Sequence, residues 1–174
     1  MKPARRNRYG IDFFEPQVMT IVNVTPDSFF DGSRTPDFAA IAERVARAVA
    51  EGCSIVDVGG YSSRPGADEV SVEEEWRRVE TGVRAVRSVS QEIPISVDTF
   101  RSEVAERAID MDCRIIINDI SAGEIDPDIL RVAVANDIPY VAMHMRGTPA
   151  TMQTLTGYAD TVAEVEQFVE KPNL

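Results

Sequence analysis

The sequence predicts an α/β fold of about five βα units, the arrangement of an incomplete (β/α)8 barrel of the TIM-barrel type. Its hydrophobic pattern alternates repeatedly between short runs rich in β-branched residues and amphipathic helical stretches. The short runs are apolar throughout, as in parallel strands that helices cover. Ligand-type side chains recur where these strands end, namely Asn23, Asp57, Asp98, Asn118 and His144. A single rim that collects the polar side chains is typical of a barrel of this type.

Each element can be placed in order from its pattern. We expect strands at 18–22, 55–58, 93–97, 114–117 and 140–143. We expect helices at 38–50, 71–89, 101–110, about 128–136 and from near residue 158 onward. A chain of 174 residues falls short of an eight-unit barrel, which needs roughly 200 residues or more. A small independent α/β domain with an open sheet is therefore the alternative.

The first two helices carry recognisable end signals. Asp37 is placed to cap the first helix, and Gly52 is placed to stop it. Ser71-Val-Glu-Glu74 opens the next helix with a capping-box pattern. We expect Glu73, Glu74 and Glu75 to form a solvated first turn that the helix dipole favours.

Composition limits the class of protein. The chain has 18 basic and 29 acidic residues and a formal net charge of −11, which argues against a nucleic-acid surface because such a surface needs a basic stripe. No run approaches the length of a membrane span, and no apolar signal region follows the basic start Arg5-Arg6-Asn7-Arg8. Cys53 and Cys113 are interpreted as buried free thiols rather than as a disulfide or a metal site. We expect a single domain over 1–174, with a basic segment at 1–15, in a cytoplasmic enzyme.

The loop after the first strand is rich in oxygen ligands. Asn23, Asp27, Ser28 and Asp31 lie close together at the carboxyl end of that strand, where α/β proteins bind ligands. Their oxygen atoms suit a hard cation such as Mg²⁺. An ordinary βα turn followed by a polar surface loop is the alternative.

The loop after the second strand has the features of a phosphate site. The pair Gly59-Gly60 permits close backbone approach, Ser62 and Ser63 offer hydroxyl groups, and Arg64 offers a planar guanidinium fork. The two loops together predict a phosphorylated substrate that is held with a metal ion.

Five motifs occur in a fixed order along the chain: NVTPDSFFDG, DVGGYSSRPGA, ISVDTF, INDISAG and MHMRGTPATMQ. In this order they resemble the corresponding runs of the dihydropteroate synthase family, and the resemblance covers about residues 16–170. It implies the amino-terminal portion of a transferase of folate biosynthesis, on the barrel fold. Such an enzyme condenses 6-hydroxymethyl-7,8-dihydropterin pyrophosphate with p-aminobenzoate, releases pyrophosphate and uses Mg²⁺. The resemblance also allows a homodimer and gives no reason to expect a membrane partner.

The resemblance implies that two residues form hydrogen bonds with the pterin ring and that a third packs on it. Asp98 can accept hydrogen bonds from a ring N–H and the neighbouring exocyclic amine, and its charge can stabilise a cationic pterin during the reaction. Asn118 carries both a donor and an acceptor and can bind the same ring. Met143 matches a residue that packs on the ring, although a core position is the alternative. Asp98 could instead cap the helix at 101–110, a role that Thr99 or Ser102 could also fill.

The resemblance assigns the remaining site residues to the two loops. Asn23 matches the contact to Mg²⁺ and pyrophosphate, and Asp31 matches an aspartate that orders the site when substrate binds. Ser62 and Ser63 match substrate contacts, and Arg64 matches a catalytic arginine that faces the pyrophosphate. Tyr61 stands where the family usually has glutamate, a departure that affects the geometry of this loop.

The later family motifs, with their lysine and arginine–histidine positions, do not occur in this sequence. We therefore expect a truncated chain that has little or no turnover by itself. A non-catalytic pterin-binding remnant is one alternative. A methyltetrahydrofolate-binding domain of a methyltransferase is another, although a methyl-transfer site handles no pyrophosphate.

Overall fold

The elements of the molecule follow the predicted order closely. The computed structural model describes residues 16–25, 37–62, 69–112, 114–148 and 151–170. Within these residues the strands are β1 (Met19–Asn23), β2 (Ile55–Gly59), β3 (Ile95–Asp98), β4 (Ile115–Asp119) and β5 (Tyr140–Ala142). The helices are α1 (Phe38–Ala50), α2 (Val72–Val89), α3 (Ser102–Met111), α4 (Asp128–Ala135) and α5 (Thr161–Val169), with a short 3₁₀ helix at Met152–Thr154. None of the helices in this part of the chain is both long and apolar enough to span a membrane.

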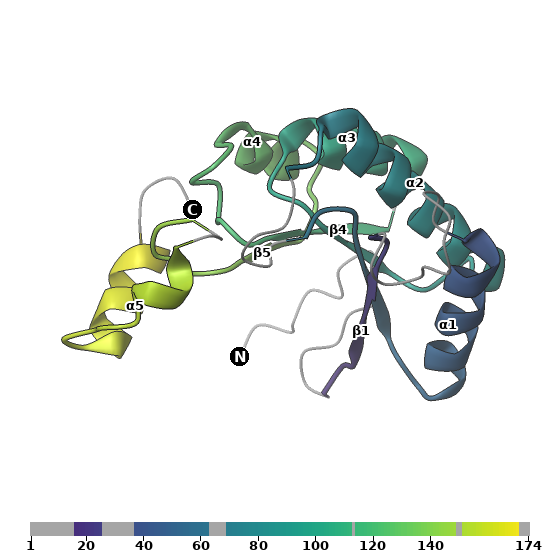
Figure 1. Cartoon of the computed structure of the whole chain (residues 1–174), viewed down its shortest axis with the longest axis horizontal. Coiled ribbons are helices and arrows are strands. Elements are labelled where there is room, and N and C mark those ends of the chain that lie inside the picture. The colour runs from purple at the N-terminus through teal and green to yellow at the C-terminus, as the bar shows by residue number, and fades with distance from the viewer. Residues whose placement is uncertain (1–15, 26–36, 63–68, 113, 149–150, 171–174) are drawn as a thin grey trace.

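The strands form one parallel sheet in their chain order, β1-β2-β3-β4-β5. Figure 1 shows α1 to α4 following one side of this sheet, while α5 stands beyond β5. A doubly wound sheet would carry helices on both faces and reverse its strand order. Strands in chain order with helices on one side instead form part of a barrel wall. The prediction of an incomplete (β/α)8 barrel is confirmed.

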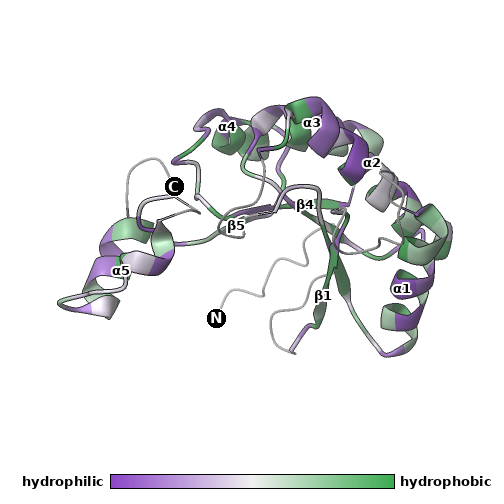
Figure 2. Ribbon diagram, in the orientation of Figure 1, coloured by the Kyte–Doolittle hydropathy of each residue, from purple (hydrophilic) through white to green (hydrophobic). Residues whose placement is uncertain are grey.

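The hydrophobic core lies between the sheet and the helices. Val22, Val58 and Val97 point to this outer face and are completely buried. Gly82 lets α2 approach the sheet, because a Cβ there would lie 2.4 Å from Val58 Cγ1. Figure 2 shows hydrophobic colours along β1 and mixed colours on the helices, as expected for amphipathic helices that cover a sheet.

The other face of the sheet, which would be the inside of a barrel, differs from the outer face. Because successive strand residues alternate between faces, this inner face carries Ile21, Asp57 and Ser96, which are partners in register across β1, β2 and β3. Asp57 and Ser96 in the central strands are only 3% and 0% exposed. Ile21 on edge strand β1 is 54% exposed, and Val141 on edge strand β5 is 45% exposed. The inner face is therefore polar and buried at Asp57 and Ser96, apolar and buried at the neighbouring Ile116 of β4, and apolar and accessible at its edges.

The helix ends confirm some predicted signals and correct others. Asp37 caps α1 by accepting a hydrogen bond from the Ala39 amide at 2.9 Å, and Gly52 follows the helix with φ of +96°. Ser71 caps α2 by accepting a bond from the Glu74 amide at 3.2 Å. The carboxylate of Glu74 does not complete a capping box, because it accepts hydrogen bonds from Arg77 and Arg78 at 2.8 Å.

The expectation that Glu75 belongs to a solvated first turn is wrong. Its side chain is completely buried, whereas the Glu73 side chain is 72% exposed. Glu75 accepts hydrogen bonds from Thr99 Oγ1 at 2.6 Å and from Arg101 at 2.8 Å. A local pattern of three acids cannot reveal these partners, since they come from the loop after β3.

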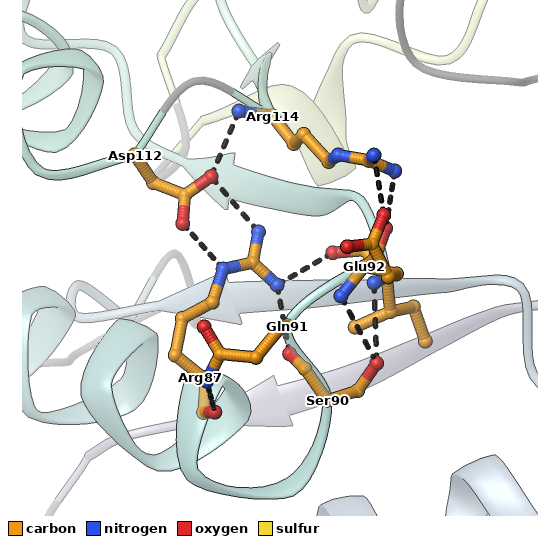
Figure 3. A network of polar contacts seen from close by, with 7 residues as sticks. Arg87, Ser90, Gln91, Glu92, Asp112 and Arg114 are labelled. Atoms are coloured by element: carbon orange, nitrogen blue, oxygen red, sulfur yellow. Dashed lines mark hydrogen bonds and ion pairs between the residues drawn. The ribbon is translucent and has the colours of Figure 1, made fainter.

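A polar network holds the elements together at the amino ends of the strands (Figure 3). Arg87, in the last turn of α2, donates to both carboxylate oxygens of Asp112, which follows α3. Arg87 also donates to the carbonyl oxygens of Ser90 and Ile93 at 3.1 and 2.7 Å. Burial alone would raise the pKa of Asp112, but the hydrogen bonds and charges of Arg87 and Arg114 hold it below its ordinary value. This network lies at the opposite end of the strands from the predicted ligand residues.

Candidate ligand-binding site

The strand register brings the predicted ligand residues into one row on the inner face. Asn23 pairs with Gly59, Gly59 pairs with Asp98, and Asp98 pairs with Asn118. A Cβ on Gly59 would lie 3.3 Å from Asn23 Oδ1 and 3.4 Å from Asp98 Oδ2. Glycine at this position therefore leaves a space that the Asn23 and Asp98 side chains border from either side.

Asp98 is a partly buried carboxylate without a hydrogen-bond partner among the described residues. It does not cap α3, because Thr99 Oγ1 accepts from the Arg101 amide and Asp126 accepts from the Ser102 amide. The alternative that Asp98 is a helix cap is therefore wrong. Its oxygens remain available for a ligand that approaches the inner face.

The electrostatic surroundings of Asp98 disfavour its charge. Burial, followed by the nearby charges of Asp57, Glu75 and Asp119, raises the pKa of Asp98 from 3.8 to about 7. A carboxyl group with such a pKa exists in both protonation states near neutral pH. Perturbation of this size, combined with the lack of an internal partner, is typical of functional carboxyl groups.

Asn118 adds an amide beside Asp98. Its Nδ2 donates a hydrogen bond to Asp57 Oδ1 at 3.2 Å, across the intervening strand β3. Burial raises the pKa of Asp57, and the nearby side chains of Ser96 and Asn118 act in the opposite direction. The row thus presents a carboxylate and an amide to the same space.

A second set of contacts joins the loops that follow β2 and β3, next to this row of residues. The Arg101 guanidinium bonds Glu75 at 2.8 Å and lies 5.4 Å from the centre of the Tyr61 ring and 5.3 Å from that of Phe100. The Tyr61 and Phe100 rings meet edge to face, with centroids 5.2 Å apart. Tyr61, which departs from the family pattern, therefore joins the loop after β2 to the loop after β3.

Asp119 organises the loop after β4. Its carboxylate accepts hydrogen bonds from the Ser121 amide and hydroxyl, the Gly123 amide and the Tyr140 hydroxyl, all between 2.7 and 2.8 Å. Asp119 is completely buried. Because its carboxylate is fully used in holding this loop and β5, Asp119 is a structural residue. Its negative charge also contributes to the raised pKa of Asp98.

Met143 and Ser62 belong to the loops that follow β5 and β2. Met143 follows β5 and is 37% exposed. It lies two residues after Val141 and therefore on the same, inner face of the sheet. The alternative that Met143 is a core residue is therefore wrong. Ser62 is half-buried directly after Tyr61. Asp31, Ser63 and Arg64 lie outside the described residues, as do Cys113 and the segment at 1–15.

His144 lies apart from these carboxylates. Its ring packs edge to face on Phe168, with centroids 4.7 Å apart, and lies 5.9 Å from the Tyr158 ring. These contacts place the His144 ring beside α5.

The described residues contain no group of three or more histidine, cysteine, aspartate or glutamate side chains that could hold a metal ion. Asn23 nevertheless offers a side-chain oxygen without a partner in this part of the chain, beside Asp98. Mg²⁺ commonly binds through one or two protein oxygens together with water and substrate phosphates. The side-chain oxygen of Asn23 therefore fits as one protein contact to Mg²⁺ that arrives with a phosphorylated ligand.

Comparisons with known proteins agree with the family resemblance. The family model described as "Pterin binding enzyme" matches residues 19–173. A dihydropteroate synthase from Synechocystis sp. is 43% identical over 87% of this chain and 52% of its own length. The chain thus spans about half the length of the relatives named dihydropteroate synthase, and a smaller share of longer folate-synthesis proteins such as that of Schizosaccharomyces pombe, of which it covers 20%.

Solved structures give the same result. The dihydropteroate synthase of Xanthomonas albilineans, solved with 4-aminobenzoic acid, superposes with a TM-score of 0.74 at 41% identity over 88% of this chain and 53% of that one. The same enzyme solved with indole-2-carboxylic acid and 6-chloroguanine gives a TM-score of 0.77 at 38% identity over 91% of this chain and 55% of that one. The fold and the order of the elements are therefore those of this enzyme group.

Proposed function

The chain belongs to the pterin-binding enzyme family, and from this membership we propose that it carries the pterin-binding portion of a dihydropteroate synthase. The proposed reaction joins 6-hydroxymethyl-7,8-dihydropterin pyrophosphate to p-aminobenzoate. The carbon–oxygen bond to pyrophosphate breaks, a carbon–nitrogen bond to the arylamine forms, and the amine loses a proton. The relatives solved with aminobenzoate and with a guanine-type ring support these two substrate classes.

The observation that carries the proposal is the pairing of Asp98 with Asn118 at the centre of the inner face. A pterin ring presents an N–H beside an exocyclic amine, and one carboxylate can accept hydrogen bonds from both. Asp98 has no partner of its own among the described residues, so ligand donors would replace water rather than an internal bond. Asn118 supplies a further polar contact to the same ring.

The raised pKa of Asp98 gives the carboxylate a role in the reaction as well as in binding. The apo site holds this group at a pKa of about 7, because burial and three neighbouring acids oppose its charge. Donors of the pterin ring favour the ionised form. The resulting negative charge faces a ring that becomes more positive as pyrophosphate departs, which stabilises the transition state more than the ground state.

The proposed metal is Mg²⁺, with Asn23 as a protein contact at the end of β1. When bound, Mg²⁺ would neutralise charge on the pyrophosphate. Asn23 is suited to this position because its oxygen borders the Gly59 space on the side opposite to Asp98. Asp31, Ser62, Ser63 and Arg64 are the residues that we propose for the remaining pyrophosphate and loop contacts.

Calorimetric titration of the chain with 6-hydroxymethyl-7,8-dihydropterin pyrophosphate tests the proposal. We expect binding that Mg²⁺ strengthens and that Asp98→Ala abolishes. Asn23→Ala should remove the Mg²⁺ effect and leave binding without the metal nearly unchanged. Asp110→Asn, which removes a charge from an exposed position on α3, is the matched control and should bind like the unmodified chain. Equal binding by Asp98→Ala and the unmodified chain would contradict the proposed site.

A further inference from the structure

We infer that Asp57 is a positioning residue, which fixes the orientation of the Asn118 amide and thereby the hydrogen-bonding pattern that the site offers to a ligand. The inference rests on the proposed function, since it concerns the ring-binding residues of the same site. Asp57 does not itself contact the ring. It acts through Asn118.

The sheet geometry places Asp57 beneath the ligand row. Asp57 lies on β2 two residues before Gly59, on the same inner face, and pairs in register with Ser96 of β3. Ser96 is small, so the Asn118 side chain on β4 can reach across β3 to Asp57 Oδ1 at 3.2 Å. Asp57 is 3% exposed, whereas Asn118 is only partly buried. One end of the amide is therefore held inside the sheet, and the other end faces the ligand space.

The chemistry of a carboxylate makes this contact directional. An ionised aspartate can only accept hydrogen bonds, so it pairs with the Asn118 Nδ2 group and repels Oδ1. The Oδ1 atom, which accepts no bond from the described residues, is then left as an acceptor for a ligand donor. An asparagine or a protonated acid at position 57 could donate as well as accept, and either orientation of the Asn118 amide would then be allowed.

A purely structural role does not explain an acid at this position. Burial raises the pKa of Asp57, so its charge weakens the folded state. Of its neighbours in register, Ile21 is apolar, and the buried Ser96 hydroxyl makes no hydrogen bond to Asp57 or to any other described residue. The negative charge of Asp57 is explained by two uses: it orients the Asn118 amide, and it adds negative potential near a pterin ring that becomes cationic during the reaction.

A double-mutant cycle tests the inference, with calorimetric titration of 6-hydroxymethyl-7,8-dihydropterin pyrophosphate as the readout. Asp57→Asn keeps the size of the side chain and should weaken binding about tenfold, the effect of losing one well-oriented hydrogen bond. In the Asn118→Ala background the same substitution should change binding less than about twofold, because its target is gone. Asp110→Asn on α3 is the matched exposed control.

Outcomes of the cycle separate a positioning role from a general effect on folding. Equal weakening by Asp57→Asn in both backgrounds, or no weakening in either, would overturn the inference. Asp57→Asn should also have a midpoint of urea unfolding at least as high as the unmodified chain at pH 8, since it removes a buried charge. A structural residue would instead show lost stability together with lost binding.

The Asn118 side-chain amide gives a second readout that needs no ligand. In nitrogen-15 spectra its Nδ2 protons should show slow exchange and a shift that follows the titration of Asp57, and both features should disappear in Asp57→Asn. If the unmodified chain does not bind the pterin probe, the proposed function fails, and this spectrum alone decides the role of Asp57. An Asn118 signal that is identical in both proteins would contradict the inference.

Discussion

The charge of Asp98 should destabilise the unliganded protein, and Asp98→Asn should relieve this cost. The pKa of Asp98 rises from 3.8 in an ordinary carboxyl group to about 7 in the fold. At about 1.4 kcal/mol per pH unit, this corresponds to about 4 kcal/mol of stability lost when the group is fully ionised. An asparagine that lacks a partner offsets part of the gain, so we expect a net increase of about 2–3 kcal/mol at pH 8.5.

The stability difference between Asp98→Asn and the unmodified chain should increase with pH. A carboxyl group with a raised pKa contributes stability that is fully present below about pH 4 and is lost as the pH rises through about 7. Between pH 5.5 and 8.5 the advantage of Asp98→Asn over the unmodified chain should therefore grow by about 2 kcal/mol. Subtracting the two proteins removes the contributions of other groups that titrate in the same range, apart from those coupled to Asp98.

Urea unfolding followed by far-ultraviolet circular dichroism at both pH values is the assay. Asp110→Asn on α3 serves as the control and should change stability by less than about 0.5 kcal/mol at either pH. An advantage of Asp98→Asn that stays constant or shrinks toward pH 8.5 would refute the electrostatic reasoning. The same variant should bind the pterin probe poorly, which would make Asp98 a residue that trades stability for function.

Three further changes test the packing around the site and at the opposite end of the strands. Arg87→Ala should lower the free energy of unfolding by about 2–3 kcal/mol, because the partly buried Asp112 loses both guanidinium hydrogen bonds and keeps the Arg114 amide. Arg131→Ala, in an exposed pair with Asp128, should cost less than about 1 kcal/mol. Equal losses in the two urea titrations would contradict this reading of the network. Gly82→Ala should lower stability by about 1–2 kcal/mol, although alanine is the better helix former, because its Cβ would meet Val58; a higher melting temperature would show that α2 can move away. Gly59→Ala should weaken pterin binding about tenfold with little change in unfolding, since its Cβ would displace Asn23 and Asp98. A loss of stability that matches the loss of binding would instead make Gly59 a packing residue.

The sequence predicted most of the fold because the signals that define it are local. The helix at 38–50 is found with those same bounds, since its apolar spacing, Asp37 cap and Gly52 stop are all adjacent in the chain. Each strand lies within about two residues of its predicted range, because a β-branched run between turn residues has few other structures open to it.

The errors came from contacts between distant elements. Glu75 reads as a solvated helix residue, yet its partners Thr99 and Arg101 are supplied by the rim after β3. The pKa of Asp98 depends on acids from β2, α2 and β4, which only the folded sheet assembles.

Asp57 was noted among the polar residues near strand ends but was not assigned to the site. A signal for it existed in the sequence: Asp57 shares the parity of Gly59 in an otherwise apolar strand, which places its charge on the inner face. That parity can be read only when the inner and outer faces of the strand are known. The link from Asp57 to Asn118 also requires the register of three strands.

The most direct test of the account is the pKa of the Asp98 carboxyl group, followed by carbon-13 NMR in the absence and presence of saturating 6-hydroxymethyl-7,8-dihydropterin pyrophosphate. We predict a midpoint near pH 7 for the free protein. With ligand, the midpoint should fall toward the ordinary range of a carboxyl group, because the ring donors favour the ionised form. A midpoint that is the same with and without bound ligand would contradict the claim that Asp98 binds the pterin ring.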